Sequence, residues 1–256
     1  MSPSSRRTFV QQAATGLGLM SFLTTRGAAA EASGSAPRRV VCVGAHPDDP
    51  ESCCGGTLRK LADAGHRVTV VYLTRGEAGI EGTSHAEAAA IRTDEAVRAC
   101  QVLGAEARFF GQVDAATVFD HAAIEAMGRT LAELAPDLVF THWPIDAHAD
   151  HQAASVLTIQ ARLRAARPFE LYFFEAFTGE QSMGFRPTDY VDITDVHAVK
   201  REAAFCHASQ QPAEYFYAPD GRARQDVIDG FRGVEFGVKA AEAFVRFTGR
   251  GARELA

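Results

Sequence analysis

The stretch Val40–Gly56, VVCVGAHPDDPESCCGG, constrains the fold most strongly, because an apolar run ends abruptly in acidic and imidazole side chains. The run Val40–Ala45 is short, valine-rich and continuous, so it predicts a strand that is buried on both faces. His46, Asp48 and Asp49 follow this run directly. Ligands of open α/β sheets bind beyond the carboxyl ends of the strands, so we interpret this tip as the active site.

Strand and helix patterns alternate along the rest of the chain. Short apolar runs predict further strands at Val68–Thr74, Ala107–Phe110, Asp137–Thr141 and Phe169–Phe174, with an edge strand at Tyr190–Ile193. Helical periodicity predicts a helix opened by Gly55-Gly56-Thr57, helices at about His85–Leu103, His121–Leu134, Asp150–Arg164 and Phe231–Phe247, and another after a Thr194 cap. The polar segment Ser209–Arg232 is predicted to be a long loop. This alternation predicts an α/β fold, with a mostly parallel sheet covered by helices on both faces.

Composition limits the partners that the protein can have. The formal net charge is −6 and no basic stripe with interleaved aromatic residues occurs, so a nucleic-acid partner is not expected. No apolar run reaches the roughly 18–20 residues that a membrane-spanning helix needs, so no membrane span is expected. The five cysteines include no CxxC pair, which argues against a cysteine zinc site.

The N-terminus has the order of an export signal. Arg6-Arg7 precedes the modestly apolar segment Ala13–Leu23, and the small residues of Arg26–Ala30 suit a signal peptidase. We therefore predict that residues 1–36 are a twin-arginine-type signal and linker, and that residues 37–256 form a single domain. The protein would then be periplasmic or extracellular. The alternative is an amphipathic N-terminal helix with two incidental arginines.

A second polar cluster follows the predicted strand at Asp137–Thr141. It contains His142, Asp146, His148, Asp150 and His151. Parallel strands end at the same edge of a sheet, so this cluster and the first can meet. Three ligands drawn from histidine and aspartate, with one position left for water, are the pattern of a catalytic zinc site. The alternative is that these side chains only cap helices and solvate loops.

Several motifs together resemble the PIG-L/LmbE family of metal-dependent N-deacetylases. They are AHPDDPE followed by GGTL, LTRGEAG, IRTDEA with LGA after it, THWPIDAHADHQAA, and HAVK with CHASQ after it. The resemblance covers essentially the whole chain after the signal, and implies a Rossmann-like three-layer α/β fold. It also implies hydrolysis of an N-acetyl group, typically from molecules that contain N-acetylglucosamine. Two departures, the inserted Pro50 and Ala149 in place of a frequent proline, remove no ligand.

The resemblance implies a role for each residue of the two clusters. The residues that match the family's zinc ligands are His46, Asp49 and His151, and another divalent metal is an alternative to zinc. Asp48 matches the general base. His148 matches the histidine that polarises the substrate carbonyl or protonates the leaving amine, with Asp150 as the partner that orients it.

Four residues are candidate substrate contacts, each with a structural alternative. Arg75 and Glu77 follow a strand and bind substrate, or form an ion pair that supports their loop. Arg92 reaches inward from a helix to a hydroxyl or phosphate, or is exposed. Trp143 lines a sugar site or fills the core. His142 is expected to support the site rather than to bind metal.

The partner expected from the resemblance is a small acetylated amino sugar or its glycoconjugate. An amidase that acts on a larger acyl or amide conjugate, and a non-catalytic sugar-binding protein, are the competing functions. The aromatic tip Tyr215–Tyr217 is either a sugar platform or an oligomer contact, so a homo-oligomer stays open.

Overall fold

The computed structural model describes residues 36–177, 180–213 and 224–248, and the structural statements below concern these residues. Only Ala36 of the predicted signal and linker is among these residues. The aromatic tip Tyr215–Tyr217 lies outside them. Among the described helices, none combines the length and the apolar character that crossing a bilayer requires.

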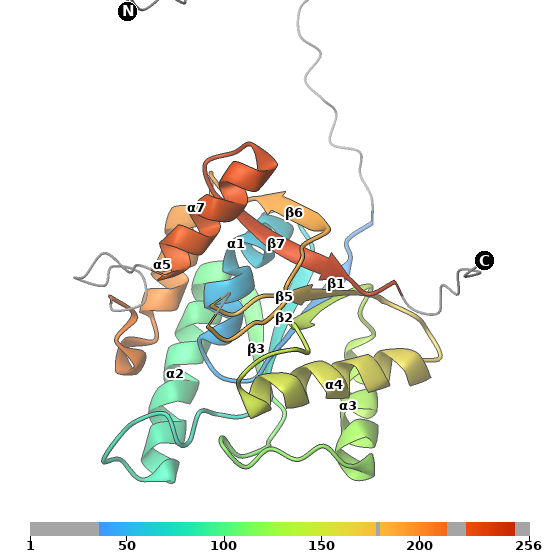
Figure 1. The fold of residues 1–256 in the computed structure, drawn as a ribbon. Coiled ribbons are helices and arrows are strands. Elements are labelled where there is room, and N and C mark those ends of the chain that lie inside the picture. Colours follow the sequence, from blue (N-terminus) through green and yellow to red (C-terminus); the bar gives the residue numbers. More distant parts are fainter. Residues whose placement is uncertain (1–35, 178–179, 214–223, 249–256) are drawn as a thin grey trace, which may run out of the picture. The chain divides into compact units, whose positions relative to one another are not determined.

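A seven-stranded sheet forms the centre of the described fold, in the order β3-β2-β1-β4-β5-β7-β6 (Figure 1). The strands are β1 (Arg39–Gly44), β2 (Arg67–Tyr72), β3 (Ala105–Phe109), β4 (Leu138–His142), β5 (Glu170–Phe174), β6 (Asp189–Asp192) and β7 (Ala241–Arg246). The helices are α1 (Asp49–Asp63), α2 (His85–Leu103), α3 (His121–Leu134), α4 (Ala149–Arg164), α5 (His197–Phe205) and α7 (Arg224–Phe236), with a 3₁₀ turn at Ala208–Gln210. Strands β1 to β5 are parallel, whereas β7 is antiparallel to both β5 and β6. The predicted α/β class and mostly parallel sheet are therefore confirmed.

Both faces of the sheet are covered, which explains the continuous apolar run in β1. Val40 and Cys42 pack with side chains of α1, α2 and α5 on one face. Val41 and Val43 pack with side chains of α3 and α4 on the other face. Successive side chains of a strand point to opposite faces, so a strand between two helical layers needs an apolar residue at every position.

The strand order reverses between β1 and β4. From β1 the chain builds β2 and β3 toward one edge, and then returns to place β4 and β5 on the other side of β1. The carboxyl ends of β1 and β4 therefore lie side by side, with Val43 paired to Thr141. Such a switch point is where open α/β sheets bind their ligands.

The predictions for the C-terminal region were wrong in two places. Helix α7 begins at Arg224, inside the segment predicted to be a loop, and ends at Phe236, before Gly237 with its φ of 80°. The predicted helix Phe231–Phe247 is therefore the end of α7 followed by β7. Phe231 and Val234, which share one face of the predicted helix, are 54% and 79% exposed.

Helix α1 also differs from its predicted start, because it begins at Asp49 rather than at Gly55-Gly56-Thr57. Glu242 of β7 accepts hydrogen bonds from the amides of Gly56 (2.9 Å) and Thr57 (2.7 Å) in the middle of this helix. A side chain at Gly56 would collide with Ile193, whose Cγ2 would lie 2.6 Å from the added Cβ. The glycine thus permits close packing instead of opening the helix.

A buried ion pair adds to this connection between the C-terminal strand and the helices. Lys200 of α5 is fully buried, and its Nζ lies 2.8 Å from Asp229 Oδ1 and 2.9 Å from Glu242 Oε1. Thr194 does not cap α5, since the residue at the cap position is Val196.

Candidate active site

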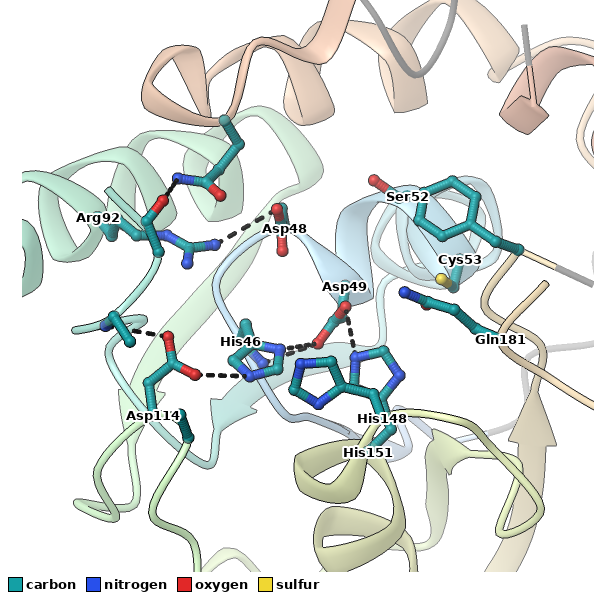
Figure 2. Close-up of a pocket in the computed structure, with 15 residues that line it drawn as sticks. His46, Asp48, Asp49, Ser52, Cys53, Arg92, Asp114, His148, His151 and Gln181 are labelled. Carbon is teal, nitrogen blue, oxygen red and sulfur yellow. Dashed lines mark hydrogen bonds and ion pairs between the residues drawn. The ribbon is translucent and has the colours of Figure 1, made fainter. Parts of the chain in front are cut away.

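The two polar clusters meet at the carboxyl ends of β1 and β4 (Figure 2). His46 and Asp49 come from the turn after β1 and the start of α1, and His151 comes from the first turn of α4. One ligand-type atom from each of these three residues lies within 4.8 Å of the others. His46 Nδ1 is 3.2 Å from Asp49 Oδ2, and His151 Nε2 is 3.3 Å from Asp49 Oδ1. These donors suit a divalent metal such as zinc.

Each of the two histidines turns its other ring nitrogen toward a carboxylate. His46 Nε2 lies 3.1 Å from Asp150 Oδ2 and 3.2 Å from Asp114 Oδ1. His151 Nδ1 lies 3.2 Å from Asp146 Oδ1. Metal-binding histidines almost always donate their second N–H in this way, which fixes the ring and its tautomer. The surroundings of both rings therefore fit metal ligation.

Asp48 lies beside this group in a strained backbone conformation. Its φ is 111°, in the left-handed region that favours glycine. Its amide donates to Glu51 Oε2 at 3.2 Å, and its carboxylate lies 3.3 Å from Nη2 of the buried Arg92. The same Arg92 nitrogen also donates to the Pro47 carbonyl at 2.5 Å. Strain of this kind persists only where the surrounding structure imposes it, typically at functional sites.

The environment moves the two neighbouring carboxyl groups in opposite directions. Burial raises the pKa of Asp48 above its ordinary value, although the charge of Arg92 opposes this shift. Burial would also raise the pKa of Asp49, but the nearby His151 and His142 hold it well below its usual range. The two neighbouring carboxyl groups therefore differ in how readily they bind a proton.

His148 is placed to act as a hydrogen-bond donor. Its Nδ1 accepts the backbone amide of Asp150 at 3.2 Å, so the neutral ring carries its proton on Nε2. Burial, followed by the charges of His151 and His46, lowers the pKa of His148, which keeps the ring neutral near pH 7. Its ring centroid lies 4.8 Å from that of His46.

Asp150 was predicted to be the residue that orients His148, and the two residues are in contact through the Asp150 backbone rather than through its carboxylate. It is the backbone amide of Asp150 that bonds His148. The carboxylate instead contacts His46 and accepts hydrogen bonds from Ala115 N (2.9 Å) and Thr117 Oγ1 (2.5 Å). The Asp150 carboxylate thus faces the turn after β1 and the segment after β3.

His142 contacts the residues that carry the site without being one of the three residues whose donors suit a metal ion. It is fully buried, its Nε2 accepts the amide of Ala45 at 3.0 Å, and its ring stacks on His151 with centroids 4.0 Å apart. Burial lowers the pKa of His142 to about 4, so the ring is neutral and able to accept this hydrogen bond. These contacts agree with the supporting role predicted for it.

The four candidate substrate contacts differ in their position relative to the cavity. Arg92 lines the cavity beside Asp48, whereas the other three are not among its lining residues. Glu77 is buried, accepts the amides of Arg75 (3.1 Å) and Asp114 (3.2 Å), and pairs with the Arg75 side chain, which favours the loop-supporting alternative. Trp143 Nε1 donates to the Met183 carbonyl at 2.9 Å, and its ring packs edge-on against aromatic neighbours.

His46, Asp49 and His151 are called the metal-type group below. A cavity of about 420 Å³ opens over this group, and its volume is within the usual range for small-molecule sites. Several of its lining residues were not singled out from the sequence, among them Asp114, Phe177 and Gln181. Asp114 follows β3, so the strand-end rule applied to a third strand would have pointed to it. Phe177 and Gln181 follow β5 in a segment whose residue spacing does not indicate a functional motif.

Comparisons with known proteins agree with this arrangement. The family model described as GlcNAc-PI de-N-acetylase, PIG-L, matches residues 41–162. Diacetylchitobiose deacetylase of Thermococcus kodakarensis is 31% identical over 195 residues, which are 69% of this chain and 72% of that protein. 4-Oxalmesaconate hydratase of Pseudomonas putida is 28% identical over 199 residues, 70% of this chain and 77% of that protein.

A solved structure of a deacetylase has a similar fold. N,N′-diacetylchitobiose deacetylase from Pyrococcus horikoshii, complexed with its inhibitor MPG, superposes with a TM-score of 0.73 and 25% identity, covering 82% of this chain and 84% of that one. The shared fold, the identity to the Thermococcus deacetylase and the matched motifs lead to one conclusion. The chain belongs to the PIG-L family of metal-dependent de-N-acetylases, enzymes that hydrolyse an amide bond.

Proposed function

We propose that this protein is an exported, zinc-dependent hydrolase that removes the N-acetyl group from an acetylated amino sugar or its conjugate, with N-acetylglucosamine as the representative unit. The observation that carries the proposal is the pairing of a metal-type group with a separate carboxylate. His46, Asp49 and His151 would hold the cation. Asp48 lies next to them, paired with Arg92 rather than with either histidine of that group.

A divalent cation at this position would polarise the acetamide carbonyl and lower the pKa of a water held beside it. Asp48 takes the proton of the attacking water as general base, and Arg92 holds its carboxylate in place. The Nε2–H of His148 donates to the oxygen on which negative charge develops, an interaction worth about 10²–10³ in rate. Asp48, protonated in the first step, then supplies the proton with which the amine leaves.

Export is supported by the N-terminal pattern alone, in which Arg6-Arg7 precedes the apolar segment Ala13–Leu23. N-terminal sequencing of the secreted protein tests this part of the proposal. A mature start shortly after Ala30 is expected, and a retained Met1 would contradict it.

The activity is tested with purified protein loaded with zinc, using N-acetylglucosamine and N,N′-diacetylchitobiose and detecting both free amine and acetate. We expect equal amounts of the two products, and their loss in Asp48→Asn with the zinc content unchanged. Longer N-acyl sugars in the same series separate deacetylation from a broader amidase. 4-Oxalmesaconate is included because one relative is named a hydratase. Turnover of that compound without release of acetate from either sugar would refute the proposal.

A further inference from the structure

Gln181 forms part of the cavity wall, and neither the metal-type group nor the proposed proton transfers involve it. It lies in the segment after β5 and lines the cavity together with His148, His151 and Asp49. Figure 2 shows its side chain reaching toward these residues from the far side of the cavity, opposite Arg92 and Asp114. A group at this position faces the part of a substrate that surrounds the scissile bond.

The backbone of Gln181 is held on both sides, so its side chain is presented from a fixed point. Its amide donates to the Phe177 carbonyl at 2.9 Å, and its own carbonyl accepts the amide of Ala147 at 2.9 Å. The next residue, Ser182, is buried and forms a β-bridge with Asp146. Preorganisation of this kind is what a binding residue requires.

The anchor of Gln181 is also the anchor of the metal-type group. Ser182 Oγ donates to Asp146 Oδ2 at 3.1 Å, while Asp146 Oδ1 faces His151 Nδ1 at 3.2 Å and accepts the amide of His148 at 2.8 Å. One carboxylate therefore sets the positions of two histidines and of the segment that carries Gln181. As a result, the backbone of Gln181 has a defined position relative to the reacting centre.

The side chain of Gln181 has unused hydrogen-bonding capacity. Its Oε1 is buried, and no donor in the described part of the chain reaches it. A buried acceptor without a partner is unfavourable, so a rotation of the carboxamide that turns this oxygen toward a ligand in the cavity would be favoured. A carboxamide offers an acceptor and two donors at one point, which matches a hydroxyl group that both donates and accepts.

We propose that the Gln181 carboxamide recognises a sugar hydroxyl next to the acetamido group, and so selects acetylated amino sugars over simpler acetamides. The inference rests on the proposed deacetylase function and adds a specificity-determining residue to it. For N-acetylglucosamine the hydroxyl is the one on carbon 3, the free neighbour of the acetamido carbon in a glycoside.

The test compares kcat/KM of the zinc-loaded protein for the methyl glycosides of N-acetylglucosamine and its 3-deoxy analogue. The wild type should prefer the hydroxylated sugar by about tenfold or more, because loss of the hydroxyl leaves the carboxamide unpaired. Gln181→Met keeps the length of the side chain without its polar atoms, and should turn over both sugars at similar, lower efficiency. Gln181→Ala serves the same purpose if the methionine variant fails to fold. Gln101→Met, the same change at an exposed position of α2, should keep the wild-type ratio.

The ratio of the two efficiencies separates recognition from a structural effect, since a general loosening of the site lowers both values together. A wild-type preference that persists in Gln181→Met would overturn the inference and leave the deacetylase function intact. A wild type that turns over both sugars equally would do the same. No turnover of either sugar by the wild type would instead refute the proposed function, and this inference with it.

Discussion

The strained conformation of Asp48 can be separated experimentally from the chemistry of its carboxylate. The comparison is between Asp48→Gly and Asp48→Ala, which remove the same carboxylate and leave Arg92 without the same partner. Their common losses cancel in the difference between the two variants. What remains is the cost of placing a Cβ at a φ of 111°.

The expected difference follows from two opposing terms. A non-glycine residue in this region costs about 1–3 kcal/mol. Alanine offsets about 0.4–1 kcal/mol of that cost, because it restricts the unfolded chain more than glycine does. We therefore expect Asp48→Gly to be more stable than Asp48→Ala by about 1 kcal/mol. That corresponds to a difference in Tm of about 2–4 °C for a domain of this size.

The assay is urea and thermal unfolding of both variants in the presence of a chelator, so that differences in metal binding do not contribute. Acetate release is measured in parallel on zinc-loaded samples and should be lost in both. An alanine variant as stable as the glycine variant, or more stable, would show that the turn relaxes and that no strain is stored at Asp48. Activity in either variant would refute its role as general base.

Three further predictions concern the histidine, the metal and the buried lysine. His148→Ala should lower kcat by about 10²–10³ with unchanged zinc content, and a loss below tenfold would contradict its role as donor. Removing the metal should lower Tm by several degrees, and re-adding zinc should restore it, because zinc at about 100 times its Kd contributes about 2.7 kcal/mol; identical melting curves would refute the metal site. Lys200→Met should cost about 3–5 kcal/mol at neutral pH, since it leaves Asp229 and Glu242 buried without their cation. Burial would lower the pKa of Lys200, but these two carboxylates raise it, so its contribution is complete below about pH 10.4 and is lost as the pH rises toward the folded-state value. The stability difference between wild type and Lys200→Met should therefore shrink above that pH in urea titrations, and a constant difference would contradict the assignment.

Local signals predicted the parts of the fold that local interactions determine. Helices α2 and α3 have the predicted bounds, and both begin after a capping side chain, Ser84 or Asp120, that accepts an amide of the first turn. Strand β7 could not be identified in this way. Its apolar residues continue the helical spacing of α7, and its extended form depends on pairing with β5 and β6. Pairing between distant segments outweighs a periodic pattern that continues past Gly237.

The candidate site shows the same division. His46, Asp49 and His151 could be predicted to meet because each lies close to the end of a strand, and parallel strands bring such ends together. The partner of the Asp150 carboxylate could not be predicted, because His148 is the nearest candidate in sequence whereas the fold brings His46 beside this carboxylate. Gln181 has its position because its segment is bonded to Ala147 and Asp146, and no residue spacing in the sequence predicts these contacts.

The hydrogen bonds that Glu242 accepts from the amides of Gly56 and Thr57 affect the order in which the protein can mature. A nascent chain that has emerged only as far as residue 162, the end of the family match, contains His46, Asp49 and His151 but not the strand that secures the first helix. Excising that stretch as a minimal catalytic fragment should therefore yield a poorly ordered polypeptide. The cation would be acquired late, after synthesis has delivered the final strand.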